Sequence, residues 1–227
     1  MMQPKPIIRA VIFDMDGLML DTERLAQEAW QQAGADLGYD LPDEIYRLAI
    51  GRTAQATAEI FGGHFGADSP FDEIYQRKQQ YYHTAIEEGR ITLKAGLLAL
   101  LAAIEERALP KAVATSTARP LALQKLAATN LLPHFTTIVC GNEVPNGKPA
   151  PDIFLAAAAK LAVTPADCLV LEDSPAGIRA AHAAGMIPIL IPDLVVPPAE
   201  VRQLAYQTVT SLYDVLPLIA ETHTTIG

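Results

Sequence analysis

The chain has 227 residues and a mass of 24.4 kDa, and its 17 Lys and Arg against 26 Asp and Glu give a formal net charge of −9. Half of the residues are hydrophobic and 19% are charged, which is the composition of a folded globular protein and excludes a disordered one. The acidic balance argues against nucleic acid as a main partner, because binding to a phosphate backbone requires clustered Lys and Arg. It is compatible with a small anionic substrate, which a few local charges can hold.

No segment of the sequence has the character of a targeting signal or a membrane span. Residues 1–6 are too few and too polar for a signal peptide, and the longest apolar stretch, 96–104, is about half the length of a span. The two cysteines, Cys140 and Cys168, are too few for a disulfide framework or a zinc site, so we expect buried, reduced thiols. These features predict a cytoplasmic protein that makes no membrane contact, and we expect a monomer.

Short apolar runs bounded by turn residues predict strands at 7–13, 112–115, 136–140, 168–171 and 187–191. They show little alternation of apolar and polar residues, which is typical of strands buried on both faces of a parallel sheet. Helical patterns lie between them at 96–107, 120–129, 152–161 and 175–184, and Gly185 supplies a stop for the last helix. This alternation predicts the α/β class, with a doubly wound parallel sheet.

One stretch, from about residue 21 to residue 92, contains no strand-like run. Helices are expected at 22–35, with Asp21 as N-cap, and at 53–61 and 71–88; Gly62 and Gly63 and the segment 68–70 should separate them. About seventy residues of helix are too many for a simple connection between two strands. We therefore predict a discontinuous α/β core, residues 1–20 and 93–227, with an inserted all-helical cap, residues 21–92.

Four carboxylates are expected at one edge of the sheet, because the carboxyl ends of parallel strands meet there and ligands bind beyond them. Asp14 and Asp16 follow the first predicted strand, and Glu172 and Asp173 follow the fourth. Four carboxylates this close together repel one another strongly in a low dielectric, and a bound divalent cation would offset the repulsion. Oxygen ligands without His favour Mg²⁺ over zinc.

The same edge should also bind a phosphate. Thr115, Ser116 and Thr117 follow the second strand and precede a helix, where hydroxyl and backbone N–H groups suit an anion, and Lys148 adds a positive charge. A carboxylate nucleophile, a second carboxyl group for proton transfer, Mg²⁺ and a phosphate cradle together predict phosphoryl transfer through an aspartyl-phosphate.

Segments 11–17, 114–116, 147–149 and 171–173 resemble, in order and spacing, the four motifs of the haloacid dehalogenase (HAD) superfamily. The resemblance covers essentially the whole chain and implies a Rossmann-like core. The inserted helices resemble the cap of the subfamily that includes β-phosphoglucomutase, sugar-phosphate phosphatases and pseudouridine-5′-phosphatase.

The resemblance implies a role for each core residue. Asp14 would be the nucleophile, and Asp16 would be the general acid and then the base that activates water. Thr115, the Ser116 backbone and Lys148 would bind the transferring phosphoryl group, with Gly17 beside it.

The resemblance also implies a metal shell and substrate contacts. Asp14, Asp173 and the backbone carbonyl of Asp16 would bind Mg²⁺ directly, and Glu172 would act through a water molecule. Arg52, Lys78 and Arg119 are candidates for substrate contacts, and a solvated surface role for each of these three residues stays open.

By resemblance, we expect a Mg²⁺-dependent phosphatase of small phosphomonoesters such as sugar or nucleoside phosphates. The alternative is a phosphosugar mutase of the β-phosphoglucomutase type. The mutases that this chain resembles carry a His in the first cap helix, where alignment places Ala26, and this difference favours hydrolysis. A non-enzymatic phosphoacceptor module is disfavoured, because such modules lack both the helical insertion and a counterpart of Asp16.

Overall fold

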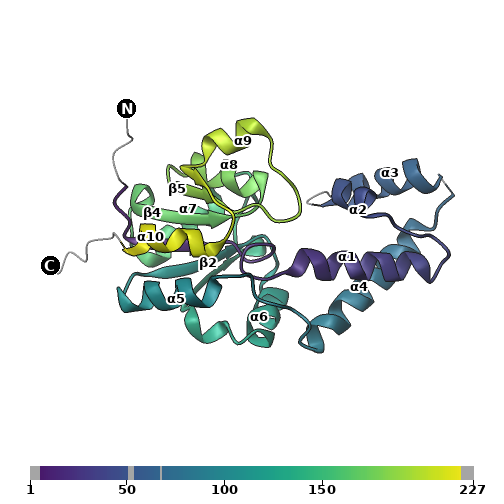
Figure 1. Ribbon diagram of the computed structural model, residues 1–227, viewed down its shortest axis with the longest axis horizontal. Helices are drawn as coiled ribbons and strands as arrows, with labels where there is room; N and C mark the ends of the chain where they lie inside the picture. Colours follow the sequence, from purple (N-terminus) through teal and green to yellow (C-terminus); the bar gives the residue numbers. More distant parts are fainter. Residues whose placement is uncertain (1–5, 51–53, 67, 221–227) are drawn as a thin grey trace. The chain divides into compact units, whose positions relative to one another are not determined.

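The computed structural model describes residues 6–50, 54–66 and 68–220. The chain divides into two compact units (Figure 1): a core unit, Met1–Leu20 with Leu93–Gly227, and a helical unit, Asp21–Thr92. The chain leaves the core unit after the first strand and returns to it before the second, so the helical unit is an insertion.

The core unit is built on a parallel sheet in which six strands are described, in the order β3-β2-β1-β4-β5-β6. The predicted doubly wound α/β fold with a helical insertion is confirmed. Five strands fall on the predicted runs, and the two-residue β6 was not predicted. The strands are β1 (Ala10–Phe13), β2 (Lys111–Thr115), β3 (Thr137–Cys140), β4 (Cys168–Glu172), β5 (Ile187–Leu190) and β6 (Gln207–Thr208).

Helices pack against the sheet and bury its strands. Helix α7 (Asp152–Leu161) contacts β1, β2 and β3, and α8 (Pro175–Ala183) contacts β4 and β5 (Figure 1). Alternate strand residues such as Ile12 and Val170 form one hydrophobic cluster with Phe154 of α7. The remaining helices of this unit are α5 (Leu97–Glu106), α6 (Arg119–Ala128), α9 (Ala199–Leu204) and α10 (Leu216–Ala220).

The helical unit contains α1 (Thr22–Ala35), α2 (Asp43–Ala49), α3 (Ala54–Phe65) and α4 (Phe71–Glu87). Trp30 is its aromatic centre, as its ring lies 4.9 Å from that of Phe61, 5.9 Å from Phe71 and 5.8 Å from Tyr75. Helices α1 and α4 pack along each other, which buries the apolar face of each.

The helical unit differs from the sequence predictions in three details. The short helix α2 was not predicted, and α3 runs through Gly62 and Gly63 to Phe65. Asp21 occupies the N-cap position of α1, but its side chain makes no cap hydrogen bond; its carboxylate pairs with Arg24 at 3.0 Å. An ion pair one turn into the helix therefore engages the side chain that was expected to cap it.

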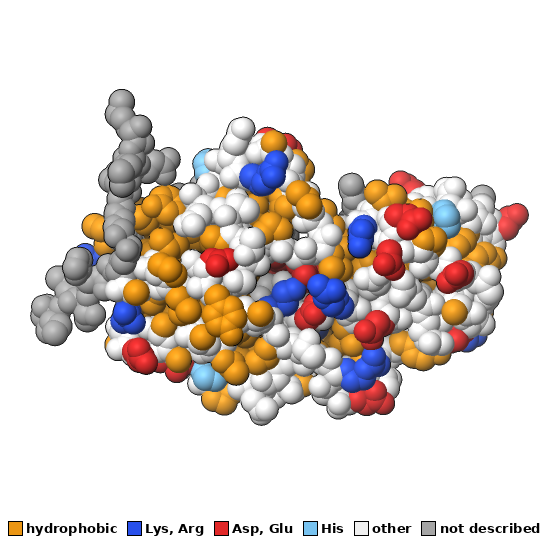
Figure 2. All heavy atoms as spheres, viewed as in Figure 1, with side chains coloured by type: hydrophobic (Ala, Val, Ile, Leu, Met, Phe, Trp, Pro, Cys, Tyr) orange, Lys and Arg blue, Asp and Glu red, His pale blue; other side chains and the backbone are white. Residues whose placement is uncertain are grey.

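The surface of the core unit carries some apolar side chains. They gather over α5 and α10 in Figure 2. Leu98 of α5 and Tyr213, which precedes α10, are each more than half exposed. Across the described residues, no helix has both the length and the apolar character that crossing a membrane requires. Cys140 and Cys168 are buried free thiols, as predicted, and burial raises the pKa of Cys168 to about 11.

Candidate active site

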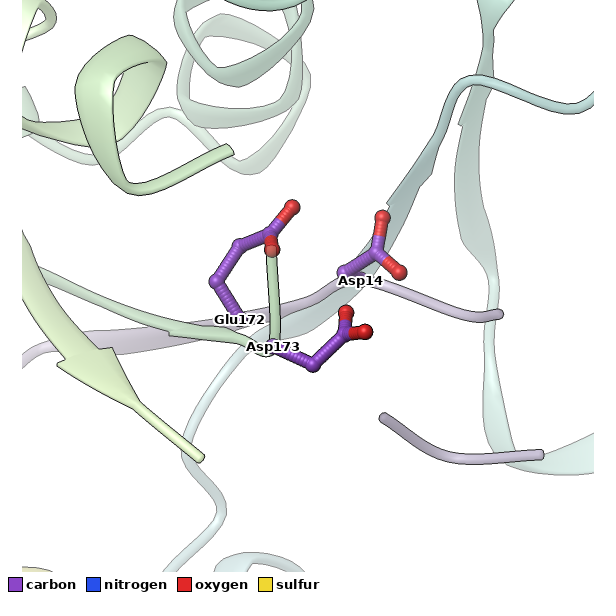
Figure 3. A group of neighbouring side chains, drawn as sticks. All are labelled: Asp14, Glu172 and Asp173. Atoms are coloured by element: carbon purple, nitrogen blue, oxygen red, sulfur yellow. The ribbon is translucent and has the colours of Figure 1, made fainter. Parts of the chain in front are cut away.

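Three carboxylates meet where β1 and β4 end. Asp14 is the first residue after β1, Glu172 is the last residue of β4, and Asp173 follows it. Because β1 and β4 are paired neighbours in the sheet, their ends lie side by side. One oxygen from each carboxylate lies within 4.8 Å of the others, and Figure 3 shows the three side chains converging.

Lys148 is the cation that faces this acidic cluster. Its Nζ contacts Asp14 Oδ1, lies 2.6 Å from Glu172 Oε1 and donates to the carbonyl oxygen of Ala114 at 3.2 Å. The ammonium also lies 4.8 Å from the centre of the Phe154 ring. The side chains of Lys148, Asp14 and Glu172 are all less than a tenth exposed, so each charge is held by its partners and not by water.

Burial and the neighbouring charges shift the pKa values of Asp14 and Lys148. Burial raises the pKa of Asp14 to about 7, and the charges of Glu172 and Asp16 raise it too, while Lys148 acts in the opposite direction. Burial disfavours the Lys148 ammonium, but Asp14 and Glu172 outweigh burial and raise its pKa. Three carboxylates meet one lysine here, so Lys148 alone does not neutralise the cluster when all three are ionised.

The donor set fits a hard divalent cation. Asp14, Glu172 and Asp173 offer only carboxylate oxygens, which Mg²⁺ and Ca²⁺ prefer, and their spacing lets one ion reach more than one of them. A bound cation would supply the positive charge that Lys148 alone does not provide.

Two glycines give these carboxylates their room. Gly17 has φ +82°, a backbone conformation that favours glycine, and a Cβ there would overlap the carboxylate of Asp173. A Cβ on Gly177 of α8 would overlap the carboxylate of Glu172. Glu172 Oε2 also accepts a hydrogen bond from the N–H of Ser174 at 2.7 Å, and the Ser174 side chain caps α8.

The loop after β2 carries the predicted phosphate-binding residues. Thr115 is buried at the end of β2, and its Oγ1 accepts a hydrogen bond from the N–H of Thr117 at 3.1 Å. Ser116 lies exposed between them, just before α6. Because β2 is paired with β1, this loop belongs to the same sheet edge as Asp14.

Asp16 has two partners that the sequence analysis missed. Its Oδ1 lies 2.7 Å from Lys125 Nζ, and its Oδ2 accepts a hydrogen bond from Thr117 Oγ1 at 2.6 Å. Lys125 lies on α6 among the buried residues Ala122 and Leu126. The position of Lys125 in the apolar stripe of a helix could have predicted an acidic partner, since a buried ammonium group needs an anion beside it.

The remaining candidates lie in other surroundings. Arg119 pairs with Glu143 at 2.6 Å and donates to the carbonyl oxygen of Ile138 at 3.0 Å. Lys78, in the helical unit, lies over the Tyr82 ring at 4.7 Å. Arg52 lies outside the described residues. Substrate contact by any of these three residues stays a prediction.

Comparison with known proteins agrees with the fold. A family model described as haloacid dehalogenase-like hydrolase matches residues 8–185. The chain is 38% identical to a probable pseudouridine-5′-phosphatase of Drosophila melanogaster, over 91% of this chain and 90% of that protein. It is 33% identical to β-phosphoglucomutase of Bacillus subtilis, over 91% and 95% respectively.

A solved structure shares the architecture. It is CbbY from Rhodobacter sphaeroides in complex with xylulose 1,5-bisphosphate, with a TM-score of 0.73, 29% identity and coverage of 92% of this chain and 96% of that chain. The class is that of α/β enzymes with a helical cap. The chain belongs to the haloacid dehalogenase-like hydrolases, and the resemblance inferred from its motifs is confirmed.

Replacing Gly177 by Ala tests the packing around Glu172. The added methyl group must displace the Glu172 carboxylate, so we expect Gly177→Ala to weaken Mg²⁺ binding about tenfold or more and to lower stability by about 1–3 kcal/mol. Calorimetric titration and urea unfolding measure the two effects. Gly63→Ala is the control, because a Cβ there meets no atom within 4 Å; equal Mg²⁺ affinity in the two variants would contradict the prediction.

The raised pKa of Asp14 predicts how Mg²⁺ binding depends on pH. Below about pH 7 the Asp14 carboxyl group of the metal-free protein carries a proton, which a cation must displace. The apparent affinity should therefore increase with pH by up to about tenfold per unit and level off above about pH 8. Calorimetry in buffers of different ionisation enthalpy should detect nearly one proton released at pH 6 and almost none at pH 8. A constant affinity without proton release at pH 6 would show that Asp14 is already ionised.

Proposed function

We propose that this protein is a Mg²⁺-dependent phosphatase that hydrolyses small phosphomonoesters through an aspartyl-phosphate on Asp14. One observation carries the proposal: Asp14 is buried at the end of a central strand, in contact with Lys148 and beside two further carboxylates. This arrangement fixes the Asp14 carboxylate in position beside a positive charge, and it suits attack on a phosphorus atom whose negatively charged oxygens must be neutralised.

The phosphoryl group would be received by residues of the core unit. An oxygen of Asp14 attacks phosphorus, and Lys148 stabilises the negative charge shared between that carboxylate and the phosphoryl oxygens. The Thr115 hydroxyl, at the end of the adjacent strand, and the N–H of Ser116 bind the phosphoryl oxygens. Asp14, Asp173 and the backbone carbonyl of Asp16 would hold Mg²⁺, with Glu172 acting through a water molecule, and the ion would supply positive charge to the reacting groups.

Asp16 would carry the proton in both halves of the reaction. When the ester bond breaks, its carboxyl group donates a proton to the leaving oxygen. The same group, now a carboxylate, then takes a proton from the water that attacks the phosphorus of the aspartyl-phosphate. Enzyme, phosphate and alcohol are the products, and Asp14 is regenerated.

The relatives and the helical unit support the proposed substrate class. One relative is named as a pseudouridine-5′-phosphatase, and CbbY was solved with a sugar bisphosphate. The helical unit has a cavity of about 220 Å³ lined by aromatic and polar groups, among them Trp30, Tyr46, Glu23 and Lys78. An aromatic face with hydrogen-bonding groups suits a sugar or nucleoside leaving group.

The mutase alternative is favoured by the similarity to β-phosphoglucomutase of Bacillus subtilis. A mutase must protect its phosphoenzyme from water while a bisphosphate intermediate turns around. Ala26, which lines the same cavity, stands where the resembling mutases carry a His. Alanine has no polar group with which to restrain Asp16, so we infer that water reaches the phosphoenzyme.

Replacing the nucleophile tests the covalent route. Asp14→Asn should lower the release of p-nitrophenol from its phosphate ester by at least about 10⁴-fold, because the step needs the carboxylate and a good leaving group does not replace it. The assay follows absorbance with and without Mg²⁺. Asp72→Asn, at an exposed position of α4, is the control. More than a trace of turnover by Asp14→Asn would show that phosphorus is attacked by another group.

Product analysis separates hydrolysis from isomerisation. Given β-glucose 1-phosphate and a trace of the 1,6-bisphosphate, the protein should release inorganic phosphate and form little glucose 6-phosphate. Both products can be measured in the same sample by phosphorus NMR. Glucose 6-phosphate appearing faster than phosphate would favour the mutase over the phosphatase.

A further inference from the structure

The carboxylate of Asp16 is bound at both oxygens by residues of the core unit. Lys125 Nζ lies 2.7 Å from Oδ1, and Thr117 Oγ1 donates to Oδ2 at 2.6 Å. Asp16 stands on the loop after β1, whereas Thr117 stands on the loop after β2 and Lys125 on α6. Two parts of the chain that are about a hundred residues apart in the sequence therefore converge on one carboxylate.

Burial makes the contact with Lys125 a demanding one. The Lys125 side chain is only 4% exposed, while that of Asp16 is 23% exposed. A buried ammonium loses most of its hydration and is stable only beside an anion in good geometry. The rigid partner is thus the lysine, held in a packed helix, and the loop carboxylate is the group whose position it fixes.

Thr117 connects Asp16 to the predicted phosphate-binding residue. Its hydroxyl donates to Asp16 while its backbone N–H donates to Thr115 Oγ1 at 3.1 Å. One residue thereby fixes the distance between the group that would move the proton and the hydroxyl that would hold the phosphoryl group.

We propose that Lys125 and Thr117 are positioning residues that hold the Asp16 carboxyl group in the place from which it transfers protons. The inference rests on the proposed function, since it assigns these two residues to the acid and base steps of that reaction. Neither residue touches the reacting atoms; both act through Asp16.

Substrates with different leaving groups can test whether Lys125 and Thr117 position Asp16. An aryl phosphate has a good leaving group and forms the phosphoenzyme without an acid. With this substrate, a displaced Asp16 should slow only the hydrolysis of the phosphoenzyme. An alkyl phosphate needs the acid as well, so formation of the phosphoenzyme should also slow. A variant that only destabilised the protein would instead lower kcat and kcat/KM by one common factor for both substrates.

The test uses two pairs of variants in the full chain. Lys125→Met keeps the length of the side chain and removes the charge, and Lys111→Met is its control, because Lys111 pairs with Glu105 at 3.0 Å at the start of β2. Thr117→Val removes the hydroxyl group at nearly constant volume, whereas Thr117→Ser restores it. The second pair keeps the test decisive if Lys125→Met fails to fold.

With p-nitrophenyl phosphate, Lys125→Met and Thr117→Val should keep kcat/KM within about threefold of the wild type while kcat falls about tenfold or more. Pre-steady-state mixing should show a burst of nitrophenol that is larger than in the wild type. With an alkyl phosphate, kcat/KM should fall about tenfold or more as well. Thr117→Ser should recover most of the loss.

A double-mutant comparison identifies Asp16 as the route of the effect. In an Asp16→Asn background, Lys125→Met should change neither kcat nor the burst by more than about twofold. Equal losses in kcat and kcat/KM, a raised kcat, or full additivity with Asp16→Asn would overturn the inference while leaving the proposed function intact. A wild-type protein that transfers no phosphoryl group from any phosphomonoester would overturn both.

Discussion

The site depends on a buried ion pair between Lys148 and Asp14. Each partner would be expensive to bury alone, and together with Glu172 they form a group whose members satisfy one another. When Asp14, Glu172 and Asp173 are all ionised, three negative charges meet the one positive charge of Lys148, which leaves an excess of negative charge. That excess is what makes the site receptive to a cation, and it explains why the carboxylates, the lysine and a metal are best understood as one electrostatic unit.

The parallel sheet and its connections bring this unit together. The strands β2, β1 and β4 are adjacent and parallel, so their carboxyl ends lie at the same edge of the sheet. Thr115, Asp14 and Glu172 are therefore brought together by the order of the strands. Two glycines leave room for the carboxylates. A Cβ at Gly17 would overlap the carboxylate of Asp173, and a Cβ at Gly177 would overlap that of Glu172. The site therefore also depends on Gly17 and Gly177, although neither residue has a side chain that could take part in the reaction.

The parallel α/β sheet and the carboxylates at its edge could be inferred from the sequence because each depends on a local signal: an apolar run, and acidic residues at its end. What the sequence analysis missed depends on contacts between distant segments. The partnership of Asp16 with Lys125 and Thr117 spans about a hundred residues. The continuation of α3 through Gly62 and Gly63 is a tertiary override of helix propensity, since α3 packs on α2 and α4.

The most direct test of the account is to locate the phosphoryl group on the protein. Asp16→Asn, which should accumulate the phosphoenzyme, is mixed with Mg²⁺ and p-nitrophenyl phosphate, quenched in acid and reduced with borohydride. Reduction converts an aspartyl-phosphate to homoserine, which peptide mass spectrometry locates. The account predicts homoserine at position 14 and at no other aspartate. Homoserine at another position, or none while nitrophenol is released in a burst, would contradict it.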